Sequence, residues 1–129
     1  MEPKIIVEED CGNAPKKLLL KELNIAFARG DSEKILSFIT DDIVWENVGE
    51  KRLEGIENFR KELENLKEVE VAELKIEHII THGWIASGNG VIHLKNGRKF
   101  AFCDVYVFNS AAKTGKIKEI KSYCIPVQK

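Results

Sequence analysis

The chain of 129 residues lacks most features that mark a specialised class of protein. Its three cysteines, Cys11, Cys103 and Cys124, are odd in number and include no Cys-x-x-Cys pair, which is typical of neither a disulfide framework nor a zinc site. No apolar run approaches the roughly 20 residues that span a bilayer, and residues 1–10 lack the pattern of a signal peptide. The formal net charge of −1 gives no reason to expect nucleic acid or a membrane as partner. These absences favour a cytoplasmic protein without a metal or other cofactor.

The first 15 residues differ in composition from the rest of the chain. They contain two of the three prolines, a Gly-Asn pair and an acidic cluster, which predict a flexible lead-in over residues 1–15. A short edge strand at residues 5–7 is the alternative. Residues 16–129 have the length and apolar content of one ordinary domain with a single core.

The spacing of apolar residues in this domain changes from helical to strand-like along the chain. Helical spacing predicts helices over residues 16–29 and 32–40 and a third after Gly55, with a β-branched strand over residues 41–48 between them. After Lys67 the period changes to two, which predicts four strands. This order predicts an α+β fold in which a curved antiparallel sheet wraps around three N-terminal helices.

The strand predicted over residues 100–108 carries one carboxylate among aromatic side chains. Alternate residues share a face of a strand, so Asp104 lies on the same face as the aromatic residues Phe100, Phe102, Tyr106 and Phe108. A charge on such a face is costly unless it is paired, hydrogen-bonded or open to a cavity. Asp104 therefore indicates either a structural hydrogen-bonded carboxylate or a polar group in a pocket.

The Asn96-Gly97 pair predicts a two-residue hairpin turn before this strand, because a type I′ turn needs two residues that tolerate positive φ. The opposed pairs would then be Asn89 with Asp104, Val91 with Phe102, and His93 with Phe100. This face should meet the helices. The other face is small and apolar, and it predicts a homodimer through the outer side of the sheet. A bulge near Gly88 or Gly90 would undo the pairing.

Five segments, taken in order, resemble the nuclear transport factor 2-like superfamily, which includes SnoaL-like polyketide cyclases, limonene epoxide hydrolases and ketosteroid isomerases. The segments are Gly30-Asp31, Asp41-Asp42-Ile43-Val44-Trp45-Glu46-Asn47, Leu53-Glu54-Gly55-Ile56-Glu57-Asn58-Phe59, Asp104-Val105-Tyr106-Val107-Phe108 and Gly115-Lys116-Ile117. The resemblance covers about residues 16 to 127. It implies a cone-shaped, cystatin-like α+β barrel with a pocket open at one end. Enzymes, ligand binders and structural dimers share this scaffold, so the resemblance implies no single activity.

The resemblance to ketosteroid isomerases is incomplete at the functional positions. Asp104 matches the family's proton-bearing aspartate, an acid that an apolar site keeps neutral. Asn47 stands at the position of the general base and Leu23 at that of the oxyanion tyrosine, and neither side chain can do that job. Ketosteroid isomerase activity is therefore not expected. The Asp-Arg-Asp set of an epoxide hydrolase is not evident either, because Arg29 and Arg98 lie near turns.

The candidate site contains Asp104 as the catalytic or anchoring group, with His93 as a proton carrier at the pocket mouth or, alternatively, an ordinary histidine near a turn. The residues expected to bind ligand are Trp45, Asn47, Asn89, Val91, Phe102, Tyr106, Ser122 and Cys124. No metal is expected, because His78 and His82 share a strand face without a third ligand.

Three functions remain open from the sequence. The first is a binding domain for a small apolar or amphipathic molecule, with its pocket marked by Asp104. The second is a cofactor-independent isomerase, cyclase or hydrolase that uses Asp104 for proton transfer. The third is a structural dimer whose pocket is filled by side chains.

Overall fold

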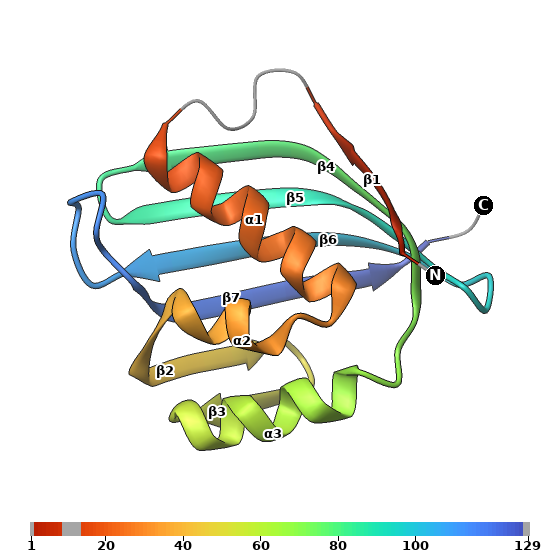
Figure 1. The fold of residues 1–129 in the computed structure, drawn as a ribbon, viewed down its shortest axis with the longest axis horizontal. Helices are drawn as coiled ribbons and strands as arrows, with labels where there is room; N and C mark the ends of the chain where they lie inside the picture. Colours follow the sequence, from red (N-terminus) through yellow and green to blue (C-terminus); the bar gives the residue numbers. More distant parts are fainter. Residues whose placement is uncertain (1, 9–13, 128–129) are drawn as a thin grey trace.

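The computed structural model describes residues 2–8 and 14–127. Within these ranges the chain forms three helices and one seven-stranded sheet (Figure 1). In chain order the elements are β1 (Lys4–Val7), α1 (Pro15–Arg29), α2 (Ser32–Ser37), β2 (Ile39–Asn47), β3 (Lys51–Glu54), α3 (Ile56–Leu66), β4 (Val71–His82), β5 (Ile85–Leu94), β6 (Lys99–Phe108) and β7 (Ile117–Pro126). The predicted α+β class is confirmed.

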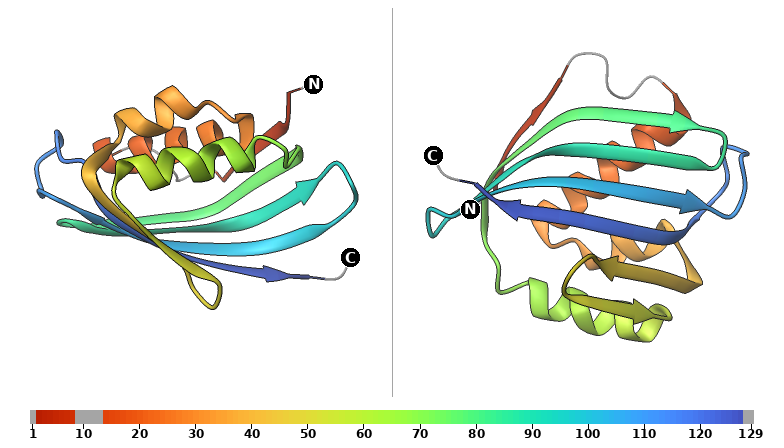
Figure 2. Two further views of the ribbon diagram at one scale, coloured as in Figure 1. Left: turned by 90° about the horizontal axis from the view of Figure 1, so that it is seen from below. Right: turned by 180° about the vertical axis from the view of Figure 1, so that it is seen from behind.

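The strands lie in the order β1-β4-β5-β6-β7-β2-β3, and the sheet curves around the helices (Figure 2). Strands β4 to β7 follow one another as antiparallel hairpins. The sheet is nevertheless mixed, because β1 pairs parallel to β4 and β2 pairs parallel to β7. The prediction of an antiparallel sheet was therefore wrong at these two pairings, where a long stretch of chain rather than a tight turn separates the paired strands.

Helix α1 begins and ends as its sequence predicts. Pro15 occupies its first turn, where a missing N–H does no harm, and Gly30 ends it with a φ of 72°. Asp31 then caps α2 by accepting a hydrogen bond from the Lys34 backbone N at 3.2 Å. Helix α2 is shorter than predicted, because Ile39 and the residues after it pair with β7 instead.

Two short edge strands complete the sheet. Strand β1 lies within the expected lead-in, so the alternative of an edge strand holds for this part, where Ile5 and Val7 pack against the core. Residues 9–13 of that lead-in lie outside the described residues. Strand β3 was not predicted, because its Lys-Arg-Leu-Glu sequence carries no apolar alternation.

The hairpin between β5 and β6 has a three-residue loop rather than the predicted two-residue one. Leu94 N donates to Arg98 O at 2.9 Å and Gly97 N donates to Leu94 O at 3.0 Å, with Gly97 at a φ of 92°. The register therefore shifts by one residue, so that Gly88 opposes Asp104 and not Asn89. A one-residue shift moves every side chain of β5 to the other face.

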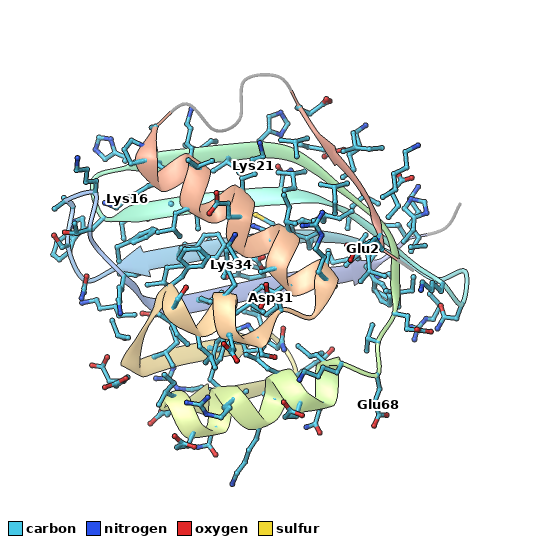
Figure 3. The ribbon with its side chains drawn as sticks, viewed as in Figure 1. Glu2, Lys16, Lys21, Asp31, Lys34 and Glu68 are labelled. Atoms are coloured by element: carbon cyan, nitrogen blue, oxygen red, sulfur yellow. The ribbon has the colours of Figure 1, made fainter. Side chains whose placement is uncertain are left out.

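Lys16 closes the fold near the start of α1. Figure 3 shows Lys16 at the opposite end of the sheet from Glu2. The Lys16 Nζ donates to the Ala111 and Ala112 carbonyl oxygens at 2.8 and 2.6 Å and lies 5.0 Å from the centre of the Phe108 ring. These contacts tie the β6–β7 loop to α1 and leave the other end of the sheet free to form a cavity.

Gly90 lies at a close approach of the β4 and β5 backbones. A Cβ built on Gly90 would collide with the Lys75 carbonyl oxygen and lie 3.0 Å from the Phe102 ring. The neighbouring β4–β5 register shifts between Ile76 and His78, so this close approach accompanies a bulge in a curved sheet.

We predict that Gly90→Ala lowers the free energy of unfolding by about 1–3 kcal/mol or more, because backbone atoms must move to admit the methyl group. Gly88→Ala is the matched control, since its nearest neighbour would be 3.7 Å away. Its effect should stay below about 1 kcal/mol in either direction. Urea unfolding of both variants checks this, and equal losses would contradict the described β4–β5 contact.

Candidate functional site

A cavity of about 240 Å³ lies between the concave face of the sheet and the second half of α1. Its wall is mostly apolar, and among the described residues that line it Asp104 is the one with a charged side chain. Several predicted site residues contribute to this wall, namely Asp104, Trp45, Asn47, Phe102, Tyr106, Ser122 and Cys124. For these residues of β2, β6 and β7, the sequence therefore predicted the correct face of the sheet.

The predicted β5 residues do not line the cavity. Asn89, Val91 and His93 lie on the outer face, where they oppose Cys103, Ala101 and Lys99 respectively. The Asn89 Oδ1 lies 3.1 Å from His78 Nδ1 instead of contacting Asp104. The assignment of these three residues to the pocket face was wrong, because the turn is one residue longer than predicted.

The cavity wall also contains residues that were not predicted, and they come from both the helices and the sheet. Asn24 lines the cavity and is buried, and Ile92 lines it from β5, opposite Phe100, in the place expected for His93. Asn24 follows Leu20 by four residues, so its place on the buried face of α1 could have been read from helical spacing. The wall is completed by Phe27 and Ala28 of α1, Leu66 of α3, Val69 between α3 and β4, Val71 and Leu74 of β4, and Ile120 of β7.

Asp104 accepts hydrogen bonds from the hydroxyl groups of two neighbouring side chains. The Tyr106 hydroxyl donates to Asp104 Oδ2 at 3.2 Å, and Tyr106 is only 1% exposed. Ser122, directly opposite Asp104 on β7, provides the second side-chain hydrogen bond. The carboxyl group is partly exposed at the cavity wall, so it also has room to contact a bound molecule.

Each of these hydroxyl groups is itself held by a donor. Asn24 Nδ2 donates to the Tyr106 hydroxyl at 3.3 Å and to the Leu20 carbonyl oxygen at 2.8 Å. Trp45 Nε1 donates to Ser122 Oγ at 3.0 Å. The Trp45 ring is fixed in turn by Phe59 and Phe27, with ring centres 5.0 and 5.7 Å away.

Burial raises the pKa of Asp104 from 3.8 to about 6, and the hydrogen bonds from Ser122 and Tyr106 oppose part of this rise. Burial likewise raises the pKa of Tyr106 well above its ordinary value and raises that of the Cys124 thiol, with the nearby Asp104 charge adding to both. Asp104 is therefore the group in the cavity wall that can exchange a proton near neutral pH.

A second, larger depression of about 480 Å³ lies beside the cavity at the end of α1. Five lining residues, Phe27, Ala28, Leu66, Val69 and Val71, are common to both, so the two spaces adjoin. The depression is more polar than the cavity, and it includes Arg29, whose Nε lies 3.0 Å from Glu2 Oε1. Arg29 thus lies at the outer depression and not beside Asp104.

No set of three potential metal ligands is found within residues 2–8 and 14–127. In the same part of the chain, no helix is both long and apolar enough to cross a membrane.

The family model of the SnoaL-like domain matches residues 20–120, which is most of the chain. The chain therefore belongs to the SnoaL-like domain family, as its sequence resemblance predicted. No curated protein matches the sequence.

Solved structures with the same fold include proteins with and without a stated activity. An NTF2-like protein of unknown function from Burkholderia xenovorans LB400 has a TM-score of 0.74 at 19% identity, over 89% of this chain and 86% of that one. An LEH-like epoxide hydrolase from M. tuberculosis has a TM-score of 0.69 at 22% identity, over 83% and 80% of the two chains. The epoxide hydrolase/cyclase-like enzyme SalBIII, described in pyran ring formation in the polyether salinomycin, has a TM-score of 0.70 at 18% identity, over 84% and 89%. At these identities the likeness shows the NTF2-like fold alone.

The raised pKa of Asp104 predicts a specific pH dependence of stability. The folded chain holds this proton more tightly than the unfolded chain, so the stabilisation is complete below about pH 4 and is lost as the pH rises through about 6. Relative to the Asp104→Asn variant, the wild type should lose up to about 3 kcal/mol of unfolding free energy between these limits. Urea unfolding across this pH range checks the difference, and parallel pH curves for the two proteins would refute it.

Proposed function

We propose that this chain binds a small, largely apolar molecule through one polar group, with Asp104 as the polar anchor. The observation that carries the proposal is an apolar cavity in which a single carboxyl group faces the free space. Such a pocket, apolar with few placed polar groups, is the usual form of a small-molecule site. The other predicted ligand contacts that line it are Trp45, Asn47, Phe102, Tyr106, Ser122 and Cys124.

The volume limits the size of this molecule. About 240 Å³ is smaller than the roughly 300–1,000 Å³ of pockets for drug-sized ligands. The adjoining polar depression leaves room for a second, charged or polar end of an amphipathic molecule. A cavity of this kind does not support the third function considered above, a pocket filled by its own side chains.

Adjacent residues of β5 offer a matched pair of variants for testing the binding proposal. Ile92 lines the cavity, whereas Val91 lies on the opposite face of the sheet. Ile92→Phe should place part of a ring in the cavity and weaken binding of the probe 1-indanol at least about tenfold, which corresponds to about 1.4 kcal/mol. Val91→Phe should leave binding unchanged.

Binding of 1-indanol can be followed by NMR through the indole N–H of Trp45, with the exposed Trp84 as an internal reference. Perturbation of Trp84 in place of Trp45, or equal binding by both variants, would contradict the proposed cavity.

A second candidate function is proton transfer by Asp104, and the observation that favours it is the pKa of about 6. A general acid or base works best when its pKa lies near the working pH. Two of the similar structures are described as epoxide hydrolase or cyclase-like enzymes, which is compatible with this chemistry. Asn47 lines the same cavity but carries no ionisable group, so Asp104 would act without a second carboxylate.

Proton transfer predicts that the chain exchanges the α-hydrogens of the ketone 1-indanone with D₂O faster than buffer does. Asp104→Asn should reduce this exchange by about a hundredfold or more, the contribution typical of one general acid or base. Exchange at the buffer rate for the wild type would rule out this candidate and leave the binding proposal standing.

We further propose that the outer face of the sheet binds a second copy of this chain. Figure 2 shows the outer face of β4–β7 turned away from the helices, and exposed apolar residues lie on it, with Ile125 62% and Tyr123 43% exposed. Neighbouring β7 residues include Lys121 and Glu119, so the face carries both signs of charge, which suits pairing with itself.

Sedimentation of the wild type should show a dimer, and Ile125→Lys should shift it toward the monomer by adding a charge to each copy's interface. A wild type that stays monomeric at high concentration would overturn the proposal of a dimer.

A further inference from the structure

In the hydrogen bonds around Asp104, each donor lies on the side away from Asp104 and each acceptor lies on the side toward it. On one side, Trp45 can only donate, because an indole has an N–H and no acceptor, and it donates to Ser122 Oγ. On the other side, Asn24 Nδ2 faces the Leu20 carbonyl oxygen, which can only accept, so the amide nitrogen must be on this side. Its other hydrogen is directed to the Tyr106 hydroxyl.

These outer groups decide how the two hydroxyl groups are oriented. Each hydroxyl group has a single hydrogen, and each already accepts a hydrogen bond from Trp45 or Asn24. Its own hydrogen is therefore directed to Asp104. If a protonated Asp104 donated a hydrogen bond to either hydroxyl group, the hydrogen of that hydroxyl group would need another acceptor, and the described residues form no such hydrogen bond with it.

We propose that Trp45 and Asn24 are positioning residues that keep Ser122 and Tyr106 as donors to Asp104, so that a proton on Asp104 points into the cavity. The inference rests on the proposed function and narrows the ligand class. A protonated Asp104 would bind a neutral molecule whose oxygen accepts a hydrogen bond, such as a ketone or an ether. An ionised Asp104 would bind a molecule that donates one, such as an alcohol or an ammonium group.

Other titratable groups do not change this dependence of the ligand class on the protonation state of Asp104. Those that face Asp104 are Tyr106 on its own strand and Cys124 on β7, and both have raised pKa values, so both stay neutral near neutral pH. Helix α1 and strand β2 contribute Asn24, Trp45 and Asn47, which do not titrate. Among the described lining residues there is no lysine, arginine or histidine.

The first test needs no ligand and measures the pKa of Asp104 by ¹³C NMR of its carboxyl carbon. Trp45→Phe removes the donor that holds Ser122 Oγ, so the Ser122 hydroxyl group can turn away from Asp104 and stabilises the ionised carboxylate less. The protonated form is thereby favoured, so the pKa should rise by about half a unit or more. Extra space from the smaller ring would ease solvation and lower the pKa, so the direction separates the two effects.

Trp84→Phe is the matched control, because Trp84 is 54% exposed and lies outside the cavity wall. In the Trp84→Phe variant, the pKa of Asp104 should equal that in the wild type. Asn24→Leu frees Tyr106 in the same way as Trp45→Phe frees Ser122, and it serves as an independent variant should Trp45→Phe fold poorly. An unchanged or lowered pKa in the folded variants would overturn the inference.

The second test compares the ketone 1-indanone with its alcohol, 1-indanol, at about pH 5 and about pH 8, followed by the Ile92 amide resonance. Above pH 6 the ketone should lose about tenfold in affinity per pH unit as protonated Asp104 becomes scarce, and the alcohol should not. Trp45→Phe should reduce the difference in pH dependence between the affinities for the ketone and the alcohol at least threefold. Ser122→Thr, which keeps a hydroxyl group, should preserve the difference, and Ser122→Ala should reduce it.

The outcomes separate the two proposals. If both probes bind with a ratio that does not change with pH, the binding function stands and the inference is overturned. If neither probe binds the wild type, the proposed binding function fails, and the carboxyl titration alone decides whether the hydrogen bonds around Asp104 have a fixed direction.

Discussion

The packing of α1 into the concave face of the sheet is the contact on which the rest of this structure depends. At the start of the helix, Lys16 holds the β6–β7 loop, and Leu20 and Leu23 are fully buried. One helical turn further on, Asn24 replaces an apolar residue, and the space between helix and sheet becomes a cavity. A solid core and a cavity thus lie at the two ends of a single interface, and the residues of α1 determine where one gives way to the other.

Within that cavity, two opposing effects act on Asp104. Removal from water favours its neutral form, while the hydroxyl groups of Ser122 and Tyr106 favour its charged form. Neither effect prevails completely, so the carboxyl group titrates close to neutral pH instead of being permanently neutral or ionised.

The family and the class of fold could be predicted from the sequence, because they depend on local signals. The stripe of α1, the Gly30-Asp31 boundary and the alternation around Asp104 each involve a few adjacent residues, and all three are found in the structure. The pairing of β5 with β6 could not be predicted in the same way. Asn-Gly occurs in two-residue turns and also fits the three-residue loop with Gly97 at positive φ, and the choice between them moved three predicted site residues to the outer face.

By itself, the sequence determined that Asp104 lies on an aromatic strand face with Tyr106 and Phe102, because side-chain alternation along one strand requires no knowledge of its neighbours. Only the tertiary structure decided which groups surround that carboxyl group. Asn24 comes from an element distant in the chain, and its contact with Tyr106 depends on helix packing. The placement of Ser122 directly opposite Asp104 depends on the register of β6 with β7. The position of the charge is therefore a property of local sequence, whereas its proton affinity and the direction of its hydrogen bonds are properties of the folded chain.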